Sequence, residues 1–184
     1  MKLSSSFFAV FSFCILLSTG SLFAADYWFI PREIYLKETL SLLISWTSKS
    51  RVIILLFNFF VTKGKSTEDL AQKLISLKKD FPRMSLNILL EGEKGKGDPR
   101  GAAERNMASA KYLAAQGVKV GFVSGVRDGD VHGAAHAKVV AVDDYIIVGS
   151  NNWTMTSIEK NNEMNVMVKS NPLADAFRKY FHDL

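Results

Sequence analysis

Two short apolar runs, separated by a pair of aspartates, constrain the fold of this chain most strongly. Residues 138–142 read Lys-Val-Val-Ala-Val and residues 145–148 read Tyr-Ile-Ile-Val. A strand with one buried face alternates apolar and polar residues, whereas a continuously apolar strand of this length is buried on both faces. Asp143 and Asp144 are typical turn residues. The two runs therefore predict a hairpin of two strands inside a sheet that is covered on both sides.

The rest of the chain alternates between helical and extended patterns, which predicts an α/β fold. Apolar residues at helical spacing indicate helices, and short apolar runs between turn residues indicate strands. We expect helices at residues 32–49, 66–79 (capped by Ser66 or Thr67), 102–115 and 172–181, strands at 52–60, 84–90, 117–123 and 163–168, and loops at 91–101 and 124–135. This order predicts a mixed, largely parallel β-sheet flanked by helices on both faces.

The first 25 residues have the composition of an export signal. Lys2 gives a positive start, residues 7–17 are mainly apolar, and small residues from Ser18 to Ala25 suit signal-peptidase cleavage. We expect a signal peptide at residues 1–25, export to the periplasm or the medium, and one domain at 26–184, a typical domain length. An uncleaved membrane anchor is the alternative, because the apolar stretch approaches the length that spans a bilayer.

His136 and Lys138 stand at the start of the first apolar run. Alternate residues of a strand point to the same side, so an extended segment places the imidazole next to the ammonium. A neutral imidazole can attack phosphorus while a fixed cation holds the remaining phosphate oxygens. The pair therefore predicts phosphoryl-transfer chemistry that needs no metal ion.

The predicted hairpin brings a second polar segment, residues 149–152, back to the level of His136. Side chains of cross-strand partners share one face of a sheet. A two-residue turn at residues 143–144 would put Asn151 opposite His136. A three-residue turn would put Asn152 there instead. The sequence leaves both registers open.

Together these residues resemble the signature of the phospholipase D superfamily, His-x-Lys-x4-Asp followed by Gly-Ser-x-Asn. The chain carries one copy, at residues 136–143 and 149–152, and the likeness continues through Trp153 and Thr154 to Glu163. The gap between the two parts is one residue shorter than is usual in the family, which indicates a tighter turn. The resemblance implies a phospholipase D-like α/β/α sandwich. Among its members, a short exported chain with one motif is most similar to bacterial Nuc-type endonucleases and their mitochondrial, cardiolipin-hydrolysing relatives.

The resemblance also implies a role for each candidate residue. His136 looks like the nucleophile, Glu163 like the carboxylate that orients it, and Asp143 like the signature aspartate, which is usually structural in the family. The implied phosphate ligands are Lys138, Ser150 and Asn152. No cofactor is implied. His132 and His136 are four residues apart, but they precede a strand and lack the glutamate of a zinc-protease helix, so no metal site is expected.

A single motif is insufficient for both proton transfers of this mechanism. The phosphohistidine route needs a nucleophile and a general acid, and one imidazole cannot begin in both protonation states. His132 and His182 are not followed by lysine at the second position. We therefore expect a homodimer in which His136 of a second subunit supplies the proton, as in the one-motif members of the family.

The formal net charge of +5 favours a polyanionic partner. Basic side chains occur mainly in the expected loops and helix ends, at Lys63, Lys65, Lys78, Lys79, Lys94, Lys96, Arg100, Arg105 and Arg127. Such loops bind DNA or RNA through the backbone phosphates without selecting sequence. The first hypothesis is an exported, metal-independent phosphodiesterase, a nonspecific endonuclease. The alternatives are a phospholipase D that releases phospholipid head groups and a noncatalytic envelope protein that binds DNA.

Overall fold

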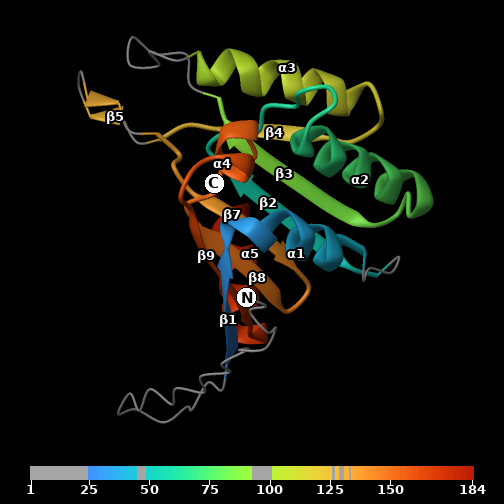
Figure 1. Cartoon of the computed structure of the whole chain (residues 1–184), viewed down its shortest axis with the longest axis vertical. Coiled ribbons are helices and arrows are strands. Elements are labelled where there is room, and N and C mark those ends of the chain that lie inside the picture. The colour runs from blue at the N-terminus through green and yellow to red at the C-terminus, as the bar shows by residue number, and fades with distance from the viewer. Residues whose placement is uncertain (1–24, 45–48, 93–100, 126, 129–130, 133) are drawn as a thin grey trace, which may run out of the picture.

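In the described part of the chain, seven strands form one mixed sheet at the centre of the molecule (Figure 1). They are β1 (Asp26–Pro31), β2 (Arg51–Leu56), β3 (Ser85–Glu91), β4 (Val120–Val123), β7 (Lys138–Val142), β8 (Tyr145–Gly149) and β9 (Met164–Lys169). The order across the sheet is β1-β9-β8-β7-β2-β3-β4. The mixed α/β sheet predicted from the sequence is therefore confirmed.

The computed structural model describes residues 25–44, 49–92, 101–125, 127–128, 131–132 and 134–184. The expected signal peptide, apart from its last residue, and most of the expected loop at residues 91–101 lie outside these ranges. Both stay predictions. No helix within the described ranges is long and apolar enough to cross a membrane.

The sheet has a parallel half and an antiparallel half. β2, β3 and β4 pair in parallel, whereas β2 with β7, β7 with β8, β8 with β9, and β9 with β1 pair antiparallel. The parallel part is therefore smaller than the sequence predicts. The two-residue connection between β7 and β8 is too short for the crossover that a parallel pair needs, so these two strands can only pair antiparallel.

Helices cover both faces of this sheet, as predicted (Figure 1). Side chains of α1 (Arg32–Ile44), α2 (Ser66–Asp80), α3 (Ala102–Ala114) and α4 (Met155–Glu159) share one apolar cluster, and α5 (Asn171–His182) packs in a second cluster on the opposite face. β5 (Arg127–Asp128) and β6 (Val131–His132) form a separate hairpin in the region expected to be a loop. β1 and the single-turn α4 are likewise absent from the sequence prediction.

The cap predicted for the second helix is wrong. Lys65 occupies the N-cap position of α2 without a side-chain capping bond. The hydroxyl of Ser66 donates to Glu159 on α4 at 2.9 Å, and that of Thr67 accepts from the backbone N–H of Thr62 at 3.0 Å. Tertiary contacts therefore use both hydroxyls that the sequence assigns to capping.

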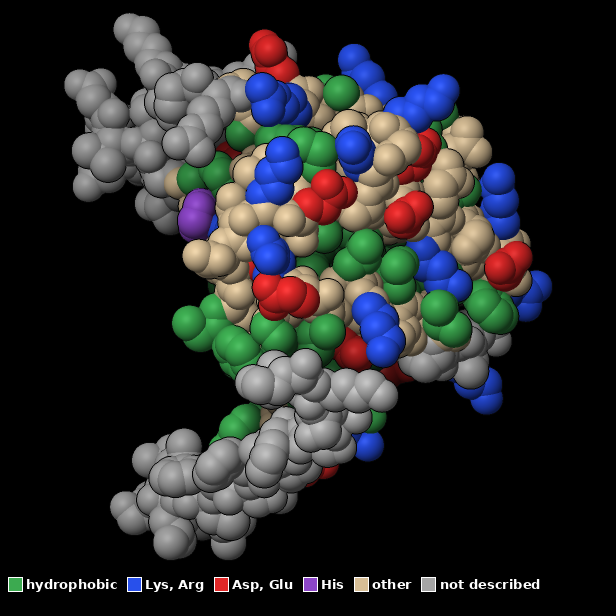
Figure 2. Space-filling view, in the orientation of Figure 1, with side chains coloured by type: hydrophobic (Ala, Val, Ile, Leu, Met, Phe, Trp, Pro, Cys, Tyr) green, Lys and Arg blue, Asp and Glu red, His purple; other side chains and the backbone are tan. Residues whose placement is uncertain are grey.

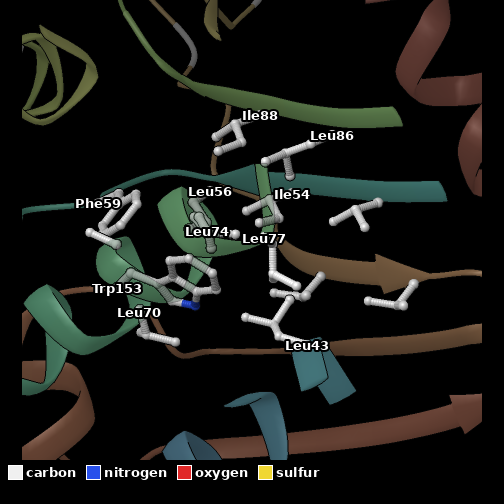
Figure 3. Packing of buried hydrophobic residues seen from close by; sticks show 14 of the residues in the cluster. Leu43, Ile54, Leu56, Phe59, Leu70, Leu74, Leu77, Leu86, Ile88 and Trp153 are labelled. Carbon is white, nitrogen blue, oxygen red and sulfur yellow. The ribbon is translucent and has the colours of Figure 1, made fainter. Parts of the chain in front are cut away.

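The first apolar run contributes side chains to both layers of the core. Val140 and Val142 of β7 belong to the cluster beneath α1 and α2, while Val139 and Ala141 face α5. This two-sided burial is what the continuous apolar pattern predicts. In the larger cluster, the buried ring of Trp153 packs edge-on against Phe59, with ring centroids 4.9 Å apart (Figure 3).

Asp143 fixes the turn of the hairpin. Val142 pairs with Tyr145, so the turn has two residues, and Asp143 adopts a left-handed φ of 51° that aspartate tolerates better than most residues. Its side chain accepts a hydrogen bond from the backbone N–H of Arg51 at 2.9 Å, and its carbonyl accepts from Nη1 of Arg178 at 2.6 Å. The turn is thereby tied to β2 and to α5.

Gly149 is predicted to be required for the close packing of β8 on β9. It pairs with Asn165, and a Cβ at position 149 would overlap the side-chain oxygen of Asn165 and the backbone carbonyl of Met164. Gly149→Ala should lower the free energy of unfolding by about 1–3 kcal/mol, measured by urea denaturation, because the backbone of β9 must shift to make room for the added methyl group. Gly121→Ala is the matched control, since its Cβ meets mainly the flexible end of Leu89. Equal stability of both variants would contradict the prediction.

Candidate active site

The predicted site residues, apart from Asp143, lie together at one end of the strands of the sheet. Lys138 at the start of β7 pairs with Leu56 at the end of β2, and Gly149 at the end of β8 pairs with Asn165 near the start of β9. The carboxyl ends of the parallel strands β2, β3 and β4 lie at this same end. Ligand sites of open α/β sheets are typically found there. Asp143 lies at the other end of β7, roughly 16 Å away by the rise of a strand.

His136 and Lys138 lie side by side at this end, as an extended segment predicts. Nζ of Lys138 is 3.1 Å from Nδ1 of His136 and donates to the carbonyl oxygen of His136 at 2.6 Å. The His136 side chain is exposed, whereas Lys138 is buried. The ring of Phe57 contacts both, with its centroid 4.7 Å from the imidazole and 5.3 Å from Nζ. The lysine is thus fixed by a carbonyl and an aromatic face, and the imidazole remains accessible.

The surroundings favour a neutral imidazole beside an ammonium that is easy to deprotonate. Burial, and then the charge of Lys138, lower the pKa of His136 below its ordinary value of 6.5. Burial also lowers the pKa of Lys138 to about 8, and the negative charge of Glu163 raises it in part. At neutral pH the site therefore presents an uncharged nitrogen base and a cation, which is the pairing that attack on a phosphate requires.

Glu163 lies near this pair, but its hydrogen bonds go to other residues. One carboxylate oxygen accepts from the hydroxyl of Ser150, and the other accepts from Nδ2 of Asn161 at 3.0 Å. Ser150 in turn accepts from the backbone N–H of Met164 at 3.0 Å. No hydrogen bond among the described residues joins Glu163 to His136. The negative charge of Glu163 raises the pKa of Lys138, and its role as the carboxylate that orients His136 stays a prediction.

The two candidate asparagines have different surroundings. The two-residue turn brings Asn151 to the level of His136, yet Asn151 is buried and its side chain is bonded to Asn165 at 2.7 Å and to the carbonyl of Ser157 at 3.1 Å. The half-buried Asn152 instead accepts at Oδ1 from the backbone N–H of Asn58, at 3.1 Å. That bond leaves Nδ2 of Asn152 as a donor.

Asn58 connects Asn152 to the histidine segment. The backbone N–H of Phe57 donates to the carbonyl of Ala137 at 2.9 Å, so the pairing of β2 with β7 continues past the end of β2. This register places Asn58 next to His136. Asn152 therefore reaches the site because the chain leaves the sheet after Gly149, and not by the hairpin register.

Two buried polar residues that sequence reasoning missed hold the segments around His136. Nδ2 of Asn106 on α3 donates to the carbonyls of Phe57 and Glu91, both at 2.8 Å, and its Oδ1 accepts from the backbone N–H of Phe59 at 2.9 Å. The carboxylate of Glu91 accepts from the backbone N–H of Ala135 at 2.5 Å. Asn106 lies on the buried face of α3 together with Ala103. An amide on the apolar face of a predicted helix is the sequence feature that could have identified this residue.

Within the described residues, no group of three or more histidine, cysteine, aspartate and glutamate side chains is arranged to hold a metal ion. The polar groups that face the phosphate position are instead an imidazole, an ammonium and an amide. An accessible imidazole beside a buried ammonium is suited to nucleophilic attack on a phosphate ester.

Comparison with known proteins gives the family directly. A family model described as "Cardiolipin synthase, PLD-like domain" matches residues 43–184. The chain therefore belongs to the family of phospholipase D-like domains, and the resemblance seen in the sequence is confirmed. None of the curated proteins compared with the chain matches it.

Solved structures share the fold. NucT from Helicobacter pylori aligns with a TM-score of 0.62 at 18% identity, over 86% of this chain and 94% of that one. The phospholipase D family member Nuc from Salmonella typhimurium aligns with a TM-score of 0.58 at 22% identity, over 86% and 91%. A phosphatidylserine synthase from Haemophilus influenzae aligns with a TM-score of 0.65 at 12% identity, over 85% of this chain and 36% of that one.

The pKa values of the site predict a bell-shaped pH profile. The kcat/KM for bis(p-nitrophenyl) phosphate, whose leaving group departs without help from a general acid, should rise as His136 loses its proton, below pH 6.5, and fall as Lys138 loses its proton near pH 8. Glu163→Gln removes a charge that raises the pKa of Lys138, so the alkaline limb should move to lower pH. Glu104→Gln, an exposed carboxylate on α3, is the control and should leave the profile unchanged. An unmoved or upward-shifted alkaline limb in Glu163→Gln would contradict the assignment.

Proposed function

We propose that the protein is an exported endonuclease that hydrolyses phosphodiester bonds of DNA and RNA without a metal ion. The observation that carries the proposal is the neutral, accessible imidazole of His136 held beside the buried ammonium of Lys138. The net charge of +5 supports a polyanionic substrate. The composition of residues 1–25 supports export.

The proposed reaction has two displacements at one phosphorus atom. In the first, a ring nitrogen of His136 forms a bond to phosphorus while the bond to the leaving oxygen breaks, and that oxygen takes a proton from a general acid. In the second, water attacks the phosphohistidine, gives its proton to the group that acted as the general acid, and releases the imidazole as the bond between phosphorus and nitrogen breaks. Nζ of Lys138 and Nδ2 of Asn152 are the donors available to hold the non-bridging oxygens throughout.

A homodimer would supply the general acid, as His136 of a second subunit. Exposed apolar side chains on the face of the sheet that carries α5 support a subunit interface. Phe29 of β1 is 60% exposed, Val148 of β8 is 43% exposed, and both pair with Val166 on the same row across the sheet. Met164, next to Glu163 in sequence, is 64% exposed. Burial of this row against its two-fold copy is one way in which such a dimer could form.

The same apolar row favours a second candidate function, a phospholipase D that acts on membrane lipids. The exposed side chains of Phe29 and Met164 are suited to contact with acyl chains. The chemistry at His136 would be unchanged, and only the leaving group would differ. A noncatalytic DNA-binding role is disfavoured, because His136 and Lys138 are both present and in contact.

The first test is cleavage in the presence of a chelator. With EDTA, the purified protein should cut DNA and RNA and leave anionic phospholipid vesicles intact, because the site needs no metal to bind phosphate. His136→Ala should reduce cleavage to background, whereas His182→Ala, an exposed histidine on α5, should not.

Three outcomes would count against this function. Head-group release with nucleic acid left intact would favour the phospholipase. Cleavage that persists in His136→Ala would refute the nucleophile. Loss of cleavage on addition of the chelator would refute metal independence.

The second test concerns the shared site. When wild type and His136→Ala are co-refolded in varied ratios, each mixed dimer should be inactive, because it lacks either the nucleophile or the acid. Activity should therefore fall with the square of the wild-type fraction. Mixing with His182→Ala should cause no loss. A linear fall with His136→Ala would show that each subunit works alone.

A further inference from the structure

A hollow of 560 Å³ lies between α2, α3 and α4, beyond the site itself. Its lining includes the aromatic side chains Phe60 and Tyr112, the cations Lys63 and Arg105, and Thr154 and Met155. Figure 2 shows hydrophobic side chains exposed between these helices, with lysine and arginine side chains around them. This size is within the range of small-molecule pockets. Neither His136 nor Lys138 contributes to the lining.

Two segments run side by side from the site into this hollow. Phe59 and Trp153 pair as parallel neighbours, with the N–H of Trp153 donating to the carbonyl of Asn58 and the N–H of Phe60 donating to the carbonyl of Trp153, both at 2.9 Å. Asn58 lies at the phosphate site, and Phe60 lies in the hollow. Two residues of extended chain cover about 7 Å. That is close to the distance between neighbouring phosphates in an extended single strand of nucleic acid.

The side chains in the hollow combine a flat surface with positive charge. The guanidinium of Arg105 lies 5.3 Å from the centroid of the Phe60 ring. Arg105 and Lys63 are exposed. The carboxylate of Glu68, also in the lining, accepts from the backbone N–H of Gly64 at 2.6 Å. Aromatic rings and arginine planes are the surfaces on which proteins stack unpaired bases, and exposed lysine or arginine binds the adjoining phosphate.

We propose that this hollow binds the nucleotide next to the scissile phosphate, with its base stacked on the Arg105–Phe60 pair and its far phosphate held by Lys63. The inference rests on nucleic acid being the substrate, and adds the subsite that recognises it. A base inside a duplex is paired and stacked between neighbours, so only an unpaired nucleotide can enter the hollow. The subsite therefore distinguishes a single-stranded polynucleotide from a small phosphodiester, which ends before the hollow.

The test compares two substrates in the full chain. Arg105→Gln should lower kcat/KM for a single-stranded oligonucleotide about tenfold, the size of one lost base-stacking contact, and leave kcat/KM for bis(p-nitrophenyl) phosphate unchanged. Arg83→Gln is the matched control. It removes the same charge from an exposed arginine just before β3, at the opposite end of the strands. It should change kcat/KM for either substrate little. Phe60→Leu should behave like Arg105→Gln, with thermal unfolding measured to confirm that it is folded.

The outcomes separate this inference from the proposed function. Equal loss on the oligonucleotide in Arg105→Gln and Arg83→Gln would mean that only overall charge matters, and would overturn the subsite while leaving the nuclease intact. Equal loss on both substrates in Arg105→Gln would also overturn the subsite, because the effect would then lie at the reacting phosphate. Failure of the wild type to cleave any nucleic acid would refute the proposed function first.

Discussion

The antiparallel pairing of β7 with β2 is the contact on which the rest of the molecule depends. It joins the parallel half of the sheet to the antiparallel half, and it places Lys138 opposite Leu56. Because the pairing continues to Phe57 and Ala137, the segment that carries His136 lies against the loop that leaves β2. His136 is therefore positioned next to deeply buried strands of the core, and it is itself exposed.

Burial of Lys138 has two effects: it strengthens the attraction of the ammonium for an anion, and it lowers the pKa of the ammonium. Removing an ammonium from water is costly, and here the His136 carbonyl, the Phe57 ring and the charge of Glu163 offset that cost. A cation with little water around it interacts more strongly with a phosphate oxygen. The same desolvation brings its pKa to about 8, close to the working range of most enzymes. Attraction for phosphate and dependence on pH thus have one physical cause.

The loop after β2, residues 57–60, is held in place by hydrogen bonds from distant parts of the chain. Asn106 bonds to Phe57 and Phe59 of this loop and to the end of β3, while the backbone of Trp153 bonds to Asn58 and Phe60. The backbone from Phe57 to Phe60 is therefore hydrogen-bonded on two sides. A fixed backbone here sets Asn58 beside His136 and Phe60 in the neighbouring hollow. One rigid segment therefore relates the reacting centre to the surface proposed to read the adjoining nucleotide.

Sequence alone determined the hairpin, the alternation of strands and helices, and the contact of His136 with Lys138, because all of these follow from local periodicity and from neighbours within a few residues. The tertiary structure decided what local rules cannot reach. Asn152, and not Asn151, contacts the segment next to His136, because the side chain of Asn151 is buried against Asn165 and Ser157. Glu163 forms hydrogen bonds with Ser150 and Asn161. The antiparallel half is larger than predicted because β1 and β9, which are far apart in the sequence, pair with each other. Such contacts depend on packing between distant segments, and no spacing along the sequence records them.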